Sequence, residues 1–138
     1  MKQLNIIDLI DGVRKLEQRI SVALMYSGIR IPQLRTLNVI DEEGRVTVTA
    51  LSKRLGVTRA TASIMVNELI SSGIVYSVEN ETDRRSFYVK LTISGKQKLN
   101  VARGDLMEFQ KSLSRDLSEE LIVSIESFIG YVRKTGNK

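Results

Sequence analysis

The spacing of apolar residues changes in the middle of the sequence, and this change restricts the fold more than any other feature. Over residues 58–72 apolar side chains recur every three or four positions, which is the period of a helix. After Gly73 the period falls to about two, with strand-like residues at 74–78 and alternating ones at 87–92. The pattern predicts a helix followed directly by a two-stranded hairpin with a long charged tip.

A shorter helix is predicted just before this unit. Thr47 or Thr49 can cap a helix through residues 51–55, and Gly56 suits the left-handed position that ends one. Thr58 can then cap the next helix. Two helices joined by three or four residues form a helix-turn-helix, and a hairpin directly after it completes a winged helix.

Amphipathic helices flank this unit on both sides. The earlier part of the chain predicts a helix over residues 6–24 and a second helix whose first turn accommodates Pro32. The later part predicts a long helix from about residue 94 and a last one from about 118 to 134. The predicted fold is therefore mainly α with a small β wing (α+β), a winged helix-turn-helix with flanking dimerisation helices.

The length of 138 residues fits one domain. We expect a winged-helix lobe at about 30–95 and dimerisation helices at about 1–28 and 96–138. The apolar stripes of the flanking helices exceed what one small lobe can cover, which favours a homodimer. Packing of the stripes on each other within one chain is the alternative. The residues expected at the dimer interface are Ile6, Ile10, Val13, Leu113, Leu121, Ile125 and Phe128.

The chain contains no cysteine and no histidine. Disulfides, thiol-based redox sensing, the commonest zinc sites and nucleophile pairs that use histidine are therefore excluded. The acidic runs at residues 41–43 and 119–120 are explained by a turn and by a helix start. We expect neither an enzyme nor a cofactor or metal site.

The formal net charge of +5 is concentrated in the middle of the chain. Nine basic and four acidic residues lie between Leu51 and Arg103, whereas the charges of the remaining residues cancel. A basic middle in a neutral frame indicates a polyanion-binding face, and a solvated surface without a partner is the alternative. Charges at Asp8, Asp11 and Arg14 argue against a signal peptide or membrane span, so we expect a cytoplasmic protein without membrane contact.

Two groups of polar residues fit the grooves of double-stranded DNA. A helix enters the major groove, and an extended cationic tip enters the minor groove. At the tip, Asp83 stands two residues before Arg85, so that its carboxylate can hold one guanidinium while the arginines project. The residues expected to contact DNA are Thr58, Arg59, Thr61, Ser63, Asn67, Asp83, Arg84 and Arg85.

Residues 50–61 with Leu69 and 73–75, followed by Asp83-Arg84-Arg85 and residues 89–95, resemble the MarR family of bacterial transcriptional regulators. The resemblance extends to the number and order of the flanking helices. It implies an obligate dimer whose first, fifth and sixth helices interlock, with two lobes on successive major grooves of a pseudo-palindromic operator. It also implies transcriptional repression.

Carried over by position, the resemblance places Arg59, Thr61, Ser63 and Asn67 at the major groove, and Asp83 with Arg85 at the minor groove. Ile64 and Glu68 depart from the family pattern, which often has basic or polar residues there. The resemblance further implies a small aromatic or phenolic ligand near the hinge after the first helix. The hinge residues that would bind it are Met25, Tyr26, Arg30 and Arg35.

The residue types leave other functions open. The hinge residues also fit a purely structural role, in which Met25 and Tyr26 pack the hinge and Arg30 is solvated. Their residue types favour this structural role over ligand binding. A winged-helix scaffold that binds an acidic protein is the alternative to a DNA-binding regulator. Single-stranded RNA is disfavoured, since seven aromatic residues are too few for a stacking platform.

Overall fold

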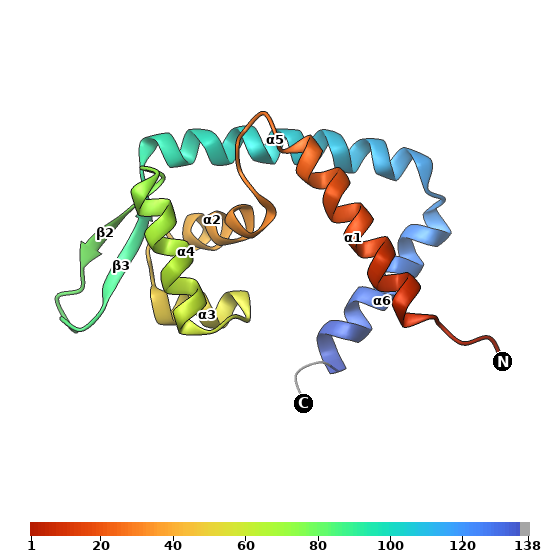
Figure 1. Ribbon diagram of the computed structural model, residues 1–138, viewed down its shortest axis with the longest axis horizontal. Coiled ribbons are helices and arrows are strands. Elements are labelled where there is room, and N and C mark those ends of the chain that lie inside the picture. The colour runs from red at the N-terminus through yellow and green to blue at the C-terminus, as the bar shows by residue number, and fades with distance from the viewer. Residues whose placement is uncertain (136–138) are drawn as a thin grey trace.

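The computed structural model describes residues 1–135 and contains six helices and three strands in that range (Figure 1). The order is that of a winged helix between flanking helices, as predicted. The last three residues of the segment expected to dimerise, 136–138, lie outside the described residues. The elements are α1 (Ile6–Ala23), α2 (Ile31–Glu43), β1 (Val46–Thr47), α3 (Val48–Leu55), α4 (Arg59–Ser71), β2 (Val75–Glu79), β3 (Phe87–Leu91), α5 (Ile93–Asp116) and α6 (Glu119–Thr135).

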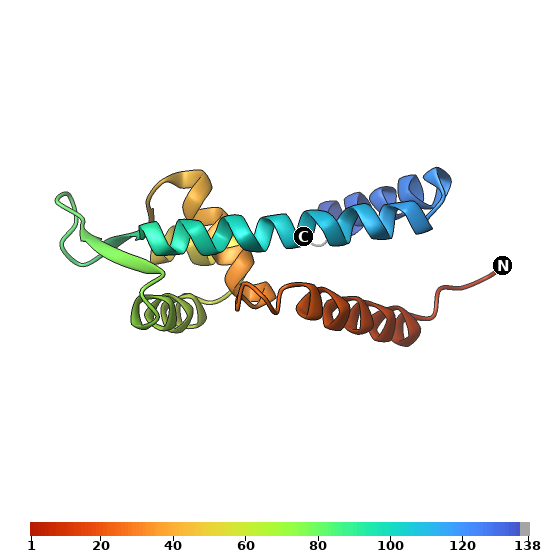
Figure 2. The same ribbon diagram turned by 90° about the horizontal axis from the view of Figure 1, so that it is seen from above.

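The molecule is elongated along α5 (Figures 1 and 2). The lobe, residues 31–91, lies at the N-terminal end of α5, and α1 and α6 lie toward the other end. The N-terminal part of α1 and the helix α6 overlap in Figure 1, but Figure 2 shows them on different sides of the molecule. Helices α1 and α6 are thus separated along most of their length.

The hydrophobic core lies in the lobe and against the first half of α5. Its largest fully buried side chains come from every helix of the lobe, from the hairpin, from α5 and from the residue after α1. By contrast, α1 itself has no buried residue. The largest fully buried apolar side chains are Leu24, Leu37, Ile40, Leu51, Leu69, Leu99, Val66, Val75 and Val89.

Local capping chemistry sets the helix-turn-helix. The Thr47 hydroxyl accepts a hydrogen bond from the Ala50 amide at 3.1 Å, so Thr47 and not Thr49 caps α3. Gly56 ends α3 with a φ of 69°, in the left-handed conformation that glycine adopts without strain. Thr58 caps α4. These three contacts fix the direction in which α4 leaves the turn.

The wing contains one strand more than the sequence predicted. The antiparallel sheet has the order β1-β3-β2, with Val46 opposite Val89 and Val75 opposite Leu91. The two-residue strand β1 is too short to show a period, which explains why it was missed. It holds the hairpin to the start of α3, so the wing has a fixed position relative to the helix-turn-helix.

The start of α5 packs very closely against the backbone just before β2. The Thr92 hydroxyl donates to the carbonyl of Gly73 at 2.8 Å, and the Thr92 amide donates to the carbonyl of Ile74 at 3.0 Å. Gly95 packs so tightly on Ile74 that an added Cβ would overlap the Ile74 carbonyl oxygen. Only glycine fits at this position.

We therefore expect Gly95→Ala to lower the free energy of unfolding by about 1–3 kcal/mol, the usual cost of overpacking. Gly104, also in α5, has open space around its Cβ position. Gly104→Ala should raise the free energy of unfolding by about 0.5–1 kcal/mol through helix propensity. Urea denaturation followed by circular dichroism measures both. Equal effects of the two substitutions would contradict this account of the joint.

A network of charged side chains joins the lobe to α5. One carboxylate oxygen of Asp41 accepts from Lys96 Nζ at 2.7 Å, and the other accepts from Arg103 Nη1 at 2.9 Å. Arg103 Nε also donates to Asn38 at 3.0 Å. The hydrogen bonds from Lys96 and Arg103 hold the pKa of Asp41 below its ordinary value of 3.8.

A lowered pKa means that Asp41 stabilises the fold at pH values above 3.8 and stops doing so as the pH falls through the folded-state value. At pH 7 we expect Asp41→Asn to lower the free energy of unfolding by about 1–2 kcal/mol. The difference from wild type should shrink steadily in acid. Denaturation at a series of pH values measures it. A difference that does not depend on pH would show that the Asp41 charge is not responsible.

Candidate nucleic-acid interface

The side of α4 that faces away from the core is polar in its first turns. Arg59, Thr61 and Asn67 are exposed and Ser63 is half-buried. The Thr58 hydroxyl accepts from the Thr61 amide at 3.1 Å and donates to the Thr61 hydroxyl at 3.0 Å. Thr58 is therefore engaged in capping, and the groups that α4 offers to a ligand begin at Arg59.

The tip of the wing is organised by a buried amide. The Asn80 side-chain oxygen accepts from the amides of Thr82 and Asp83, and its nitrogen donates to the Ser86 hydroxyl at 3.1 Å. Asp83 in turn accepts from the backbone amide of Arg85 at 3.1 Å and from its Nε at 3.3 Å. The predicted contact between Asp83 and Arg85 is therefore present.

This contact leaves Arg85 available to a ligand. Its side chain is 93% exposed, although one edge of the guanidinium is held by Asp83. Arg84 is exposed beside it. The wing thus presents two cations on a turn whose shape is fixed from within by Asn80 and Asp83.

A polar cleft lies between α4, the start of α3 and the wing tip. Its volume is about 520 Å³, and Arg59 and Arg85 line it together. A smaller space of about 80 Å³ shares Arg59 and Arg85 and adds Ser63. The structure therefore brings one arginine from the recognition helix and one from the wing to the same cleft. The lining residues of the larger space are Thr47, Thr49, Arg59, Asn80, Asp83, Arg85 and Ser86.

The sequence did not indicate one residue of the cleft and one contact beside the sheet. Thr49 was considered only as a helix cap, but it lines both spaces of the cleft. Arg45 lies over the Tyr88 ring, with its Cζ 4.2 Å from the ring centroid. A pairing of β1 with β3 is needed to bring Arg45 to Tyr88, and the sequence pattern gave no sign of β1.

The expected hinge residues lie between α1 and α2 and at the start of α2. Met25 and Tyr26 are 72% and 91% exposed. Arg30 pairs with Glu68 of α4 at 3.3 Å, and Arg35 donates to the Leu55 carbonyl at 3.3 Å. The two arginines thus contact α4 and the end of α3. Glu68, which departs from the family pattern, is held on the side of α4 that faces α2.

The family model described as MarR family matches residues 27–86, which span the helix-turn-helix and the wing tip. A HTH-type transcriptional regulator of Bacillus subtilis (strain 168), YcgE, is 25% identical over 103 residues, which are 75% of this chain and 67% of that protein. The chain is thus similar to the MarR family over its winged-helix lobe. Its resemblance to transcriptional regulators covers the lobe and part of the flanking helices.

Solved structures show the same fold over almost the whole of this chain. A cysteine-to-serine mutant of MarR from E. coli complexed with operator DNA matches with a TM-score of 0.82 and 24% identity, covering 91% of each chain. NadR in complex with 4-hydroxyphenylacetate matches with a TM-score of 0.73 and 20% identity, covering 98% of this chain and 96% of that one. At these identities the likeness establishes the fold, including the flanking helices.

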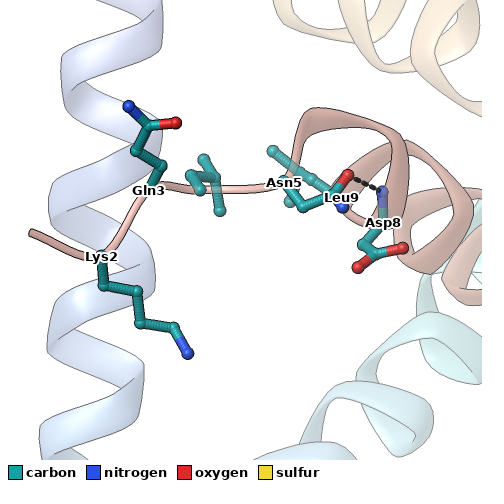
Figure 3. A pocket seen from close by; sticks show the side chains of 6 residues that line it. Lys2, Gln3, Asn5, Asp8 and Leu9 are labelled. Carbon is teal, nitrogen blue, oxygen red and sulfur yellow. Dashed lines mark hydrogen bonds between the residues drawn. The ribbon is translucent and has the colours of Figure 1, made fainter.

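The flanking helices expose a row of apolar side chains. The N-terminal arm is also exposed, and Figure 3 shows Lys2 and Gln3 on this arm, before the first turn of α1. Asn5 caps α1, since its side-chain oxygen accepts a hydrogen bond from the Asp8 amide at 3.1 Å. A shallow hollow of about 710 Å³ lies along the arm. Leu113 is half-buried. The residues of the predicted dimer interface that are at least 40% exposed are Ile6, Ile10, Val13, Leu121, Ile125 and Phe128.

The described residues contain neither a membrane-spanning helix nor a metal-binding cluster. Within residues 1–135 no helix is long and apolar enough to cross a membrane. In the same range no three acidic side chains gather as metal ligands would.

Proposed function

We propose that this protein is a MarR-family regulator that binds double-stranded DNA with sequence specificity and acts in the cytoplasm as a homodimeric repressor. The cleft that Arg59 of α4 shares with Arg85 of the wing carries this proposal. Two guanidinium groups face one polar space there, and its only carboxylate, Asp83, is already bound to Arg85. Such a site attracts a polyanion whose charged backbone is narrow enough to enter the cleft between the helix and the hairpin.

We assign the two walls of the cleft to the two grooves. Thr61, Ser63 and Asn67 lie along the outer side of α4 and would meet base edges in the major groove. Arg85, held by Asp83, would enter the adjacent minor groove, with Arg84 beside it at the backbone. Thr58 would support these contacts as the cap of α4. A MarR structure of the same fold is complexed with operator DNA, which supports this assignment.

The exposed apolar residues of α1 and α6 support a homodimer. A second copy would cover them and fill the space between the two helices, which do not cover each other (Figure 2). Two lobes related by a two-fold axis would then meet two successive major grooves. The preferred DNA should be a pseudo-palindrome with half-site centres about 10 base pairs apart.

A small aromatic or phenolic acid is the proposed effector at the hinge. NadR, which has the same fold, was solved with 4-hydroxyphenylacetate. Arg30 is the cation that would hold the carboxylate, beside Met25 and Tyr26, and Arg35 lies further along α2. Binding there would compete with the 3.3 Å contact from Arg30 to Glu68 of the recognition helix. Titration of salicylate-like acids into a protein–DNA complex tests this, and no release at millimolar ligand would retire it.

The proposed function is tested by fluorescence anisotropy of random-sequence 30-base-pair duplexes and of the DNA upstream of the gene. We expect binding to both, tighter to the upstream DNA, with an affinity that falls steeply as salt rises. Equal affinity for all duplexes would contradict sequence specificity. No binding even at low salt would contradict the proposal and favour a scaffold that binds an acidic protein.

A further inference from the structure

We infer that Arg59, together with Thr49, holds a phosphate of the DNA backbone and does not read a base edge. The inference rests on the proposed function and assigns a different role to a residue that its position in α4 would place among the base-reading groups. It also adds Thr49, which lies in the first turn of α3, to the DNA-contacting residues.

The position of the cleft favours a contact with the DNA backbone. A helix in the major groove and a wing in the neighbouring minor groove lie on two sides of one sugar-phosphate strand, because that strand separates the grooves. The cleft between α4 and the wing tip is the space that this strand would occupy. Arg59 lines that space in both of its parts.

Most polar groups in the cleft already have a partner. Asn80 and Ser86 bond to each other, the Thr47 hydroxyl accepts from the Ala50 amide, and Asp83 holds the Nε edge of Arg85. Within residues 1–135, neither the Arg59 guanidinium nor the Thr49 hydroxyl makes a hydrogen bond or ion pair. Among the described residues of the cleft, the donors that remain without a partner are the Arg59 guanidinium and the Thr49 hydroxyl, a pair suited to a phosphate.

The position of Arg59 on its helix also favours a phosphate contact. Arg59 is the first residue of α4, where the helix dipole disfavours a cation by a few tenths of a kcal/mol. The residue therefore does not serve helix stability. A phosphate beside it would meet both the guanidinium and the positive end of a 13-residue helix.

Base reading and phosphate binding give different results when Arg59 is removed. A phosphate contact is the same on every sequence, so Arg59→Ala should weaken binding to a panel of unrelated duplexes by one common factor, about 5- to 20-fold. The ratio between the preferred duplex and the others should not change. The slope of log K against log salt should fall by about one, since one fewer phosphate is neutralised.

Two further variants complete the experiment. Arg45→Ala removes the same charge from a residue that lies over Tyr88 and outside the lining of the cleft, so it should leave the slope near the wild-type value. Thr49→Val keeps the side-chain shape but removes the hydroxyl, and should weaken binding about 2- to 10-fold on every duplex. Circular dichroism of each variant checks the fold.

The assignment is overturned if Arg59→Ala weakens only the preferred duplex and leaves the salt slope unchanged, because that pattern belongs to a base contact. It is also overturned if Arg45→Ala lowers the slope as much as Arg59→Ala does. Both of these results would leave the proposed function intact. If the wild-type protein binds no duplex at any salt concentration, the proposed function and this assignment fail together.

Discussion

Arg85→Ala is expected to weaken binding to the preferred duplex by about 1–3 kcal/mol, or roughly 5- to 150-fold. Arg85 is 93% exposed, so its loss removes no packing from the fold. Its Nε is held 3.3 Å from Asp83, and its backbone amide is bonded to the same carboxylate. A cation oriented in advance loses little side-chain freedom on binding, which makes it worth more than a mobile one.

Two variants of neighbouring residues serve as controls for Arg85→Ala. Arg84→Ala removes the same charge one residue away and should cost less, because within residues 1–135 no carboxylate holds Arg84. Asp83→Asn makes the wing more positive but weakens the hold on Arg85. We expect it to reduce the affinity, whereas net charge alone would raise it. Anisotropy titrations at one salt concentration compare all three, and equal losses for Arg84→Ala and Arg85→Ala would contradict the role of the wing contact.

Phe128→Glu is expected to convert the protein from a dimer to a monomer at micromolar concentration. The Phe128 side chain is 40% exposed on α6, in the same stripe as Leu121 and Ile125. In a two-fold dimer the substitution is made twice, so two aromatic side chains leave the interface and two charges enter it. Each buried apolar side chain contributes about 1.5–3 kcal/mol, so we expect the dissociation constant to rise by more than roughly 100-fold.

Ile93→Glu is the matched control for Phe128→Glu. Ile93 is 82% exposed at the start of α5, on the lobe side and far from α6 (Figure 1). The same change at this more exposed residue should leave the mass unchanged. Light scattering of both variants and of wild type measures the mass. A wild-type protein with the mass of a monomer would overturn the dimer, and a dimeric Phe128→Glu protein would exclude α6 from the interface.

The sequence predicted the helix-turn-helix closely because short-range chemistry determines it. The caps at Thr47 and Thr58 and the left-handed Gly56 depend on residues within four positions of each other. The contact of Asp83 with Arg85 is local in the same way. These parts of the fold and of the candidate site could therefore be deduced from residues that are close together in the sequence.

The remaining contacts join residues far apart in the chain, which periodicity does not report. Asp41 meets Lys96 and Arg103 more than fifty positions later, because α2 packs on α5. Arg30 pairs with Glu68, and this contact gives a structural role to Glu68, a residue that departs from the family pattern. Thr49 joins the cleft only through the position of the wing, which the unpredicted strand β1 helps to set.

Hydroxyl-radical footprinting of the preferred duplex tests most directly whether two winged-helix lobes of one dimer bind the same DNA. The account predicts two protected segments on one side of the duplex, with centres about 10 base pairs apart. Their protection should be lost together in Phe128→Glu at a concentration where this variant is monomeric. A single protected segment in the wild-type protein, or two segments that Phe128→Glu leaves unchanged, would contradict the account.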